Sequence, residues 1–221
     1  MSDPLHVRWM RWSVQLAEAG DGRPLCLSLA NTRHWRNNAQ PKDLLQGYGD
    51  VLDWAVAKGI YTKDEAAAMR ARAEAQSTAA DAELGRVIEL REAIARVFSA
   101  RAHSRPVAPQ DFANLMETLD EASRRIKLRI VDNRLVPLVA EEDAGLALPR
   151  WQAALSAIGL YTSEAIARVK QCADDRGCGW LFLDTTRNAS RMFCFSSECG
   201  NRARQAKFRA RHRPTHGAHD H

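Results

Sequence analysis

The chain has 221 residues, of which 45% are hydrophobic and 27% are charged, and its formal net charge is +5 at neutral pH. This apolar content is enough to build a buried core, so we expect a globular body with a small appendage. No run of about 20 apolar residues is available to span a bilayer, and the first 12 residues lack the apolar core and cleavage site of a signal peptide. These absences exclude a membrane-spanning chain and predict a cytoplasmic protein.

The positive charge is concentrated near the C-terminus. Between Arg168 and Arg213 there are eleven Lys or Arg residues against four Asp or Glu residues, so the rest of the chain is slightly acidic. We therefore expect three parts: a body over residues 1–165, a basic segment over 166–213 and a disordered, histidine-containing tail over 214–221. A near-neutral body with a basic appendage indicates that a polyanion binds the appendage and not the whole surface.

The first part of the body is predicted to be mostly helical. Residues 6–12 alternate weakly, as an edge strand does, and the apolar spacing then predicts helices over 25–35, 43–58, 62–75, 81–102 and 111–125. Thr62 and Glu65 form a capping-box pattern at the start of the third helix. The helix over 81–102 is the longest of the set.

A hairpin is predicted next. Residues 126–131 and 134–139 alternate on either side of Asp132 and Asn133, two residue types that tolerate left-handed backbone angles in a tight turn. Two further helices are expected over 148–161 and 163–171. The body is therefore α+β: mostly helical, with a small β-hairpin or sheet.

Three residues of the body are candidates for a small-molecule pocket. Asn31 and Thr32 lie near the end of the first predicted helix, and Trp54 lies in the second. A polar helix end and a buried tryptophan explain these residues equally well, so both interpretations stay open. Cys26, in an apolar run, is expected to be a buried core residue.

Four cysteines in the basic segment have the spacing of a metal site. Cys172, Cys178, Cys194 and Cys199 form the pattern C-x5-C-x15-C-x4-C. In a reducing compartment such a cluster indicates zinc ligands and not disulfides. We predict one structural Zn²⁺, and because four thiolates fill its coordination shell, no position remains for an activated water. The body also lacks a glycine-rich phosphate loop or a nucleophile motif, so we do not expect an enzyme.

The local pattern around the cysteines predicts a treble-clef-like zinc module. Gly177 and Gly179 permit a tight knuckle, residues 180–184 and 191–194 fit a hairpin, and a helix follows over 203–211. Cys199 must face the metal, so at 100° per residue its helix should turn Ala203, Ala206 and Ala210 inward.

Cations border this inward stripe on both sides, and Phe208 lies opposite it. Such a surface suits phosphate contacts, although a solvated basic face has the same appearance. Phe208 should be exposed in an isolated module and so is expected to meet the body, a second subunit or another partner. The candidate nucleic-acid contacts are Arg202, Arg204, Lys207, Arg209, Arg211 and Arg213.

These residues resemble the CGNR zinc-finger family, through the four cysteines and the run Cys199, Gly200, Asn201 and Arg202 with its basic helix. The body resembles the ABATE domain that accompanies this finger, through residues 25–32, 44–54 and 90–94. The loop between Cys172 and Cys178 is one residue longer than is usual in the family. The resemblance implies stress-induced transcription regulators with a helical and β-containing N-terminal domain and a zinc module that binds DNA.

Two functions follow as hypotheses. In the first, the zinc module binds DNA, and the body senses a small-molecule effector or forms a homodimer. In the second, the zinc module is a protein-interaction or dimerisation element and its basic face is incidental.

Overall fold

The computed structural model describes residues 9–11, 23–131, 133–140 and 144–211. The body contains α1 (Leu25–Ala30), α2 (Tyr48–Ala57), α3 (Lys63–Ala75), α4 (Ser77–Ala102), α5 (Pro109–Ser123) and α7 (Leu148–Thr162), and α8 (Asn201–Arg211) follows the cysteine cluster. The strands are β1 (Trp9–Arg11), β2 (Arg33–His34), β3 (Lys42–Asp43), β4 (Ile126–Val131), β5 (Arg134–Ala140), β6 (Val169–Gln171) and β7 (Leu181–Leu183). The fold is α+β and mostly helical, as the sequence predicts.

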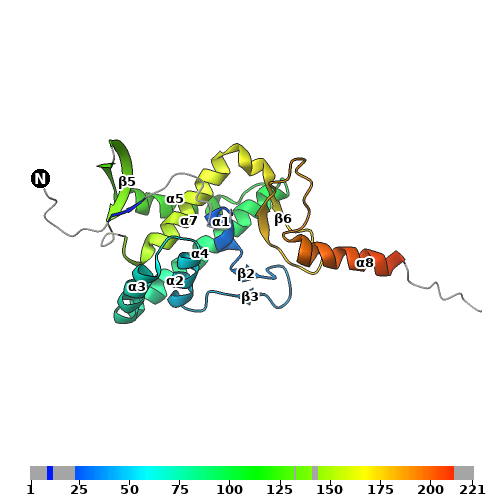
Figure 1. Ribbon diagram of the computed structural model, residues 1–221, viewed down its shortest axis with the longest axis horizontal. Coiled ribbons are helices and arrows are strands. Elements are labelled where there is room, and N and C mark those ends of the chain that lie inside the picture. The colour runs from blue at the N-terminus through cyan, green and yellow to red at the C-terminus, as the bar shows by residue number, and fades with distance from the viewer. Residues whose placement is uncertain (1–8, 12–22, 132, 141–143, 212–221) are drawn as a thin grey trace, which may run out of the picture.

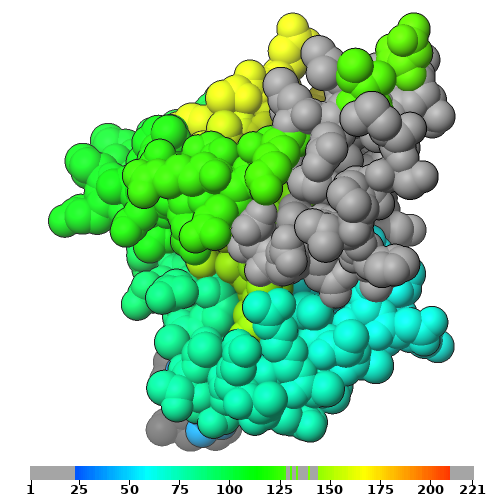
Figure 2. Space-filling view, turned by 90° about the vertical axis from the view of Figure 1, so that its left-hand side faces the viewer, coloured from blue at the N-terminus to red at the C-terminus, as the bar shows by residue number. Residues whose placement is uncertain are grey.

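Helix α4 is the centre of the body. It packs against α5, α1 and α7, and its apolar face, which includes Leu90, Ile94 and Phe98, is fully buried (Figure 1). Cys26 on α1 is also fully buried, as expected, and burial raises the pKa of its thiol to about 12. Figure 2 views the end of the molecule opposite α8, where α3, α4 and α5 form much of the surface.

Within the described residues, three small antiparallel sheets accompany the helices. The order β1-β5-β4 forms one sheet, β2 pairs with β3, and β6 pairs with β7. The predicted hairpin is confirmed, since Val131 pairs with Arg134 across the two turn residues and Asn133 has a φ of 59°. Strand β1 lies within the predicted edge strand, whose other residues, like the tail over 214–221, lie outside the described residues.

The predicted capping box is also confirmed. The Glu65 amide donates to Thr62 Oγ1, and the Thr62 amide donates to the Glu65 carboxylate. Two other helices are shorter than predicted: α1 ends at Ala30, before β2 and before Trp35 with its positive φ of 53°, and α2 begins at Tyr48 because β3 takes up residues 42–43.

Two predictions near the cysteines are wrong. Residues 163–171 form a short 3₁₀ turn, Glu164–Arg168, followed by β6, and not a helix. The expected hairpin between 180–184 and 191–194 does not form, because β7 pairs with β6 instead. The strand that precedes Cys172 is therefore the partner of β7, and the pairing joins the end of the body directly to the cysteine cluster.

Buried ion pairs fasten the long loop between β2 and α2 to the body. Arg91, only 1% exposed, donates from its two terminal nitrogens to the two Asp43 carboxylate oxygens at 2.6 and 2.7 Å. Arg36 of the same loop donates to Glu92 and to the Ala30 carbonyl. The charge-assisted bonds hold this loop in place, and its outer part reaches the cysteine cluster (Figure 1).

Candidate metal centre and nucleic-acid interface

The structure brings the four predicted cysteines together. Cys172, Cys178, Cys194 and Cys199 are all buried, and their sulfur atoms lie within 4.8 Å of one another. The Cys178–Cys194 and Cys194–Cys199 sulfur distances are 3.7 and 3.6 Å. Four thiolates about 2.3 Å from a tetrahedral zinc would lie about 3.8 Å apart, whereas a disulfide needs about 2.05 Å. The sulfur set therefore fits one structural zinc ion.

Tight backbone turns place the ligands. Cys172 follows β6, and its amide donates to the Trp180 carbonyl at 2.8 Å. Gly177 and Gly179, with φ of 88° and 68°, make the knuckle turn that the sequence predicts at these positions. Cys199 lies in a single π turn, Ser196–Gly200, that leads directly into α8. The fourth ligand thus fixes the beginning of this helix.

The pKa values of the thiols also favour a cation at this position. Hydrogen bonds from Cys178 and Cys194 lower the pKa of Cys172, whereas the pKa values of the other three thiols are raised. Burial raises the pKa of Cys199 to about 12, so its thiolate requires a compensating charge. Zinc would supply that charge, and its binding would release protons.

For Arg202, the sequence left open a role in the fold or a phosphate contact. Its guanidinium donates from Nη2 to the Cys199 sulfur at 3.0 Å and lies 3.5 Å from the buried Asp174 carboxylate. Its Cζ lies 5.0 Å from the centre of the Trp35 ring. The structure therefore directs Arg202 at the sulfur cluster, whereas Arg204, Lys207 and Arg209 are exposed. The sequence does contain a signal for this role. Arg202 lies three residues after the ligand Cys199, and residues three apart on a helix lie on the same face.

Asp184 organises the loop between Cys178 and Cys194. Its carboxylate is fully buried and accepts hydrogen bonds from Lys170 Nζ, from the Thr186 amide and hydroxyl, and from the Arg191 amide. Burial alone would raise its pKa, but the bonds from Lys170 and Thr186 outweigh burial and hold the pKa well below its usual range. Sequence reasoning missed this role, although an Asp at a strand end followed by Thr is typical of a side-chain-capped turn.

The body holds the knuckle through the loop after β2. The Asn37 amide donates to the Gly177 carbonyl at 3.1 Å, and the Asn38 side chain donates to the Arg176 carbonyl at 3.0 Å. A Cβ on Gly177 would lie 2.6 Å from the Asn37 backbone. The close approach therefore requires glycine at position 177, for contact with the body as well as for its own turn.

The three candidate pocket residues have different hydrogen-bond partners among the described residues. Asn31 is buried, and its amide forms two hydrogen bonds with the backbone of Leu181 on β7, at 2.8 and 3.0 Å. Thr32 Oγ1 donates to the Leu29 carbonyl, and Trp54 Nε1 donates to Ser28 Oγ at 3.3 Å. Of the three, Asn31 alone lines a cavity recorded among the described residues, and its amide joins α1 to the cysteine module.

Helix α8 extends away from the body (Figure 1). Arg204, Lys207 and Arg209 are exposed, and Phe208 is 63% exposed, as expected. Ala203 is half-buried, but Ala206 is exposed, so the burial of the predicted inward stripe is limited to the first turn. Arg213 and the side chains of Ala210 and Arg211 lie outside the described residues.

The fold and this centre define a helical body joined to a four-cysteine zinc module. Residues 23–164 match the ABATE family model, described as "Putative stress-induced transcription regulator", and residues 168–212 match the CGNR zinc finger. The chain belongs to the ABATE family and carries a CGNR zinc finger, as the sequence resemblance indicated. Neither description is that of an enzyme.

No curated protein shows significant sequence similarity to the chain. The described helices include none that is both long and apolar enough to cross a membrane.

Proposed function

We propose that the protein is a zinc-dependent DNA-binding transcription regulator, in which the zinc module contacts DNA and the body senses a small-molecule effector or forms a homodimer. The observation that carries the proposal is the exposed basic surface of α8. The helix contains five Lys or Arg residues and no Asp or Glu. The family description, a transcription regulator, agrees with this role.

The geometry of α8 suits a duplex. The helix has 11 residues and is therefore about 16 Å long, and the major groove of B-DNA, about 12 Å wide, admits an α-helix. Arg204, Lys207 and Arg209 are exposed, and Arg204 also donates to the Ser196 carbonyl at 3.1 Å. Arg211 and Arg213 extend the basic sequence. Arg202 is excluded from our contact set because its guanidinium faces the sulfur cluster.

Charge reversal tests this proposal. Arg204, Lys207 and Arg209 are replaced together by Glu, and duplex DNA binding is measured over a range of salt concentrations with zinc-loaded protein. Each lost phosphate contact should reduce the slope of log K against log salt by about 0.9. We expect a much weaker affinity and a slope smaller by up to about 2.7.

A matched control separates the local contact from net charge. Lys63, Arg105 and Arg125 are exposed residues of the body, and their replacement by Glu changes the net charge equally. We expect this variant to keep the wild-type slope. If both triple variants lose affinity alike, or if neither does, α8 is not the contact surface.

Phe208 favours the second function, a protein-interaction or dimerisation module. This aromatic side chain is 63% exposed on α8, where a partner could cover it. Phe208→Ala should then abolish oligomer formation or partner binding while zinc content remains at one ion per chain. An oligomeric state that Phe208→Ala leaves unchanged in sedimentation would exclude a Phe208-mediated dimer.

A further inference from the structure

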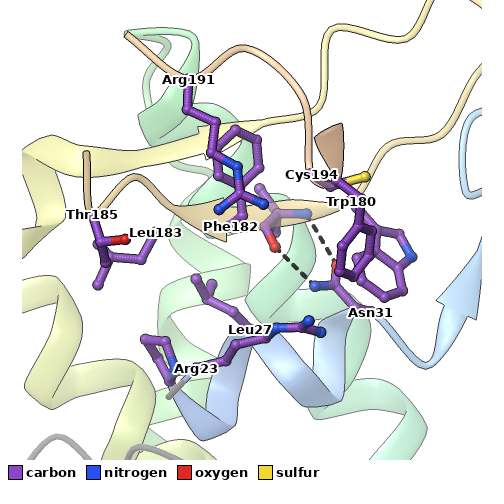
Figure 3. A pocket seen from close by; sticks show the side chains of 12 residues that line it. Arg23, Leu27, Asn31, Trp180, Phe182, Leu183, Thr185, Arg191 and Cys194 are labelled. Carbon is purple, nitrogen blue, oxygen red and sulfur yellow. Dashed lines mark hydrogen bonds between the residues drawn. The ribbon is translucent and has the colours of Figure 1, made fainter. Parts of the chain in front are cut away.

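A cavity of about 260 Å³ lies between the body and the zinc module. Its lining includes Pro24 and Leu27 of the body and Phe195 of the zinc module. Figure 3 shows Leu27 on the side of α1, with Trp180 and Phe182 on the side of the cysteine module. This size is just below the usual range for ligand sites, about 300–1,000 Å³, and so suits only a small molecule. The cavity exists only because the two parts of the chain meet here.

Two arginines line the cavity, together with Cys194 of the metal centre. Arg23 and Arg191 approach it from opposite sides, each with its guanidinium directed inward (Figure 3). Of the described residues that line it, none carries a carboxylate. Guanidinium groups favour an anionic ligand over a neutral one, because their bonds to a carboxylate are charge-assisted.

Arg191 is held in position by its own neighbours. Its Nε donates to the Phe193 carbonyl at 2.8 Å, and its Cζ lies 4.7 Å from the centre of the Phe182 ring. Within the described chain, the structure records no acceptor for its terminal nitrogens. These nitrogens are the ones that bind a carboxylate in a bidentate manner, so the group is preorganised for such a ligand.

Aromatic rings form the remaining wall. Trp180 and Phe195 lie with their ring centres 5.2 Å apart, inclined at 57°, and Arg23 Cζ lies 4.9 Å from the Phe195 ring. Flat apolar surfaces of this kind accept another ring by offset or edge contacts. The lining therefore combines a site for negative charge with a site for a planar apolar group.

We propose that this cavity binds a small aromatic carboxylate, with Arg23 and Arg191 on the carboxylate and Trp180 and Phe195 on the ring. Such a ligand joins the body to the zinc module. Phe195 also precedes the Ser196–Gly200 turn that carries Cys199 and begins α8, so occupancy stabilises the position of the helix. The effector role rests on the DNA-binding function proposed above, whereas the binding site itself does not.

Isothermal titration of zinc-loaded protein tests the binding site. The probes are benzoate and phenylacetate, with neutral benzamide and inorganic phosphate as comparisons. We expect saturable one-to-one binding of at least one aromatic carboxylate, and at least tenfold weaker binding of benzamide, since a hydrogen-bonded charge is lost. The proposal is overturned if neither carboxylate binds, if benzamide binds equally well, or if phosphate binds in preference.

Two variants and one control locate the site. Arg191→Gln and Arg23→Gln should each weaken carboxylate binding by about tenfold or more. Arg187→Gln removes the same charge from an exposed position on the same loop that does not line the cavity, and it should bind like wild type. If Arg191→Gln also lowers the zinc content, the carboxylate affinity of Arg23→Gln alone tests the position of the site. Wild-type affinity in Arg23→Gln would place the ligand elsewhere.

Duplex DNA affinity with and without saturating carboxylate tests the effector role. We expect the ligand to change the affinity at least severalfold in wild type and not in Arg191→Gln. An unchanged affinity in wild type refutes the effector role and leaves the binding site standing. If wild type binds no duplex at all, the proposed function fails, and the effector role with it, whatever the titration shows.

Discussion

The body and the zinc module are stabilised by different kinds of interaction. The body has a continuous apolar core around α4, in which Leu90, Ile94 and Phe98 are fully buried. The buried cluster of the zinc module consists of the four cysteines and Phe182, with Trp35, Trp180, Phe193 and Phe195 packed at its edge. So small an apolar cluster cannot replace the metal, and the module's order should depend on zinc while the body's does not.

Zinc removal should produce the largest effect. After chelation, we expect rapid hydrogen exchange over residues 172–211 and unchanged slow exchange in α4, because the apparent binding energy of a structural zinc, about 10–16 kcal/mol, is folding energy for its module. Exchange measured by mass spectrometry with and without chelator checks this. Equal loss of protection in α4 would show that the two parts fold as one unit.

Truncation of a core side chain should destabilise the body and leave the zinc module intact. Phe98 is fully buried, so Phe98→Ala should reduce the free energy of unfolding of the body by about 3–5 kcal/mol. Thermal or denaturant unfolding measures the loss, and metal analysis should still give one zinc per chain. A variant that retains the body fold but loses zinc would contradict the separation of the two parts.

A Gly→Ala substitution should lower stability in the zinc module and raise it in the body. Gly177→Ala places a Cβ 2.6 Å from the Asn37 backbone at a φ of 88°, so it should destabilise the contact between module and body by more than about 1 kcal/mol. Gly85 lies within α4 with open space around it, so Gly85→Ala should stabilise the body by about 0.5–1 kcal/mol. Unfolding curves of both variants give the comparison, and stabilisation by Gly177→Ala would refute the close approach.

Mild acid should have the smallest effect of these changes on the stability of the body. Burial alone would raise the pKa of Asp43 and Glu121, but hydrogen bonds from Arg91 and Arg150 outweigh it and lower both pKa values. Carboxyls with lowered pKa contribute stability that is present above their usual pKa, near 4, and is lost as the pH falls below it.

The body should therefore keep its stability down to about pH 5. Protons compete with zinc for the thiolates, so the module should lose its metal at a higher pH. Unfolding of the body monitored together with zinc release against pH checks this order. Simultaneous loss of both would contradict it.

Sequence patterns predicted best those features that depend on local chemistry or on the spacing of one residue type. The apolar period of α4, the Thr62 capping box and the hairpin beside Asn133 depend on local chemistry, and the four cysteines are identified by spacing. Sequence patterns failed for β6, which has three residues, too few to show a period, and for the partner of β7, a strand that they did predict. Their pairing depends on the turns of the metal centre and on Asn31, which is 150 residues from Leu181 along the chain.

Charge alone likewise could not show which cations of the zinc module face the sulfur cluster and which are exposed. Arg202 and Arg204 are both arginines in one helix, yet one donates to the Cys199 sulfur and the other is exposed. The direction of each side chain follows from where Cys199 fixes the start of α8. Arg191, which lines the cavity, belongs to a loop whose path is determined by the buried Asp184.

Duplex DNA binding measured before chelation, after chelation and after zinc is restored tests the central claim most directly, with body unfolding followed in the same samples. We predict that chelation abolishes salt-dependent binding, that the body keeps its unfolding transition, and that added zinc restores the affinity. Full DNA affinity in the chelated protein would contradict the claim that a zinc-held α8 is the contact surface.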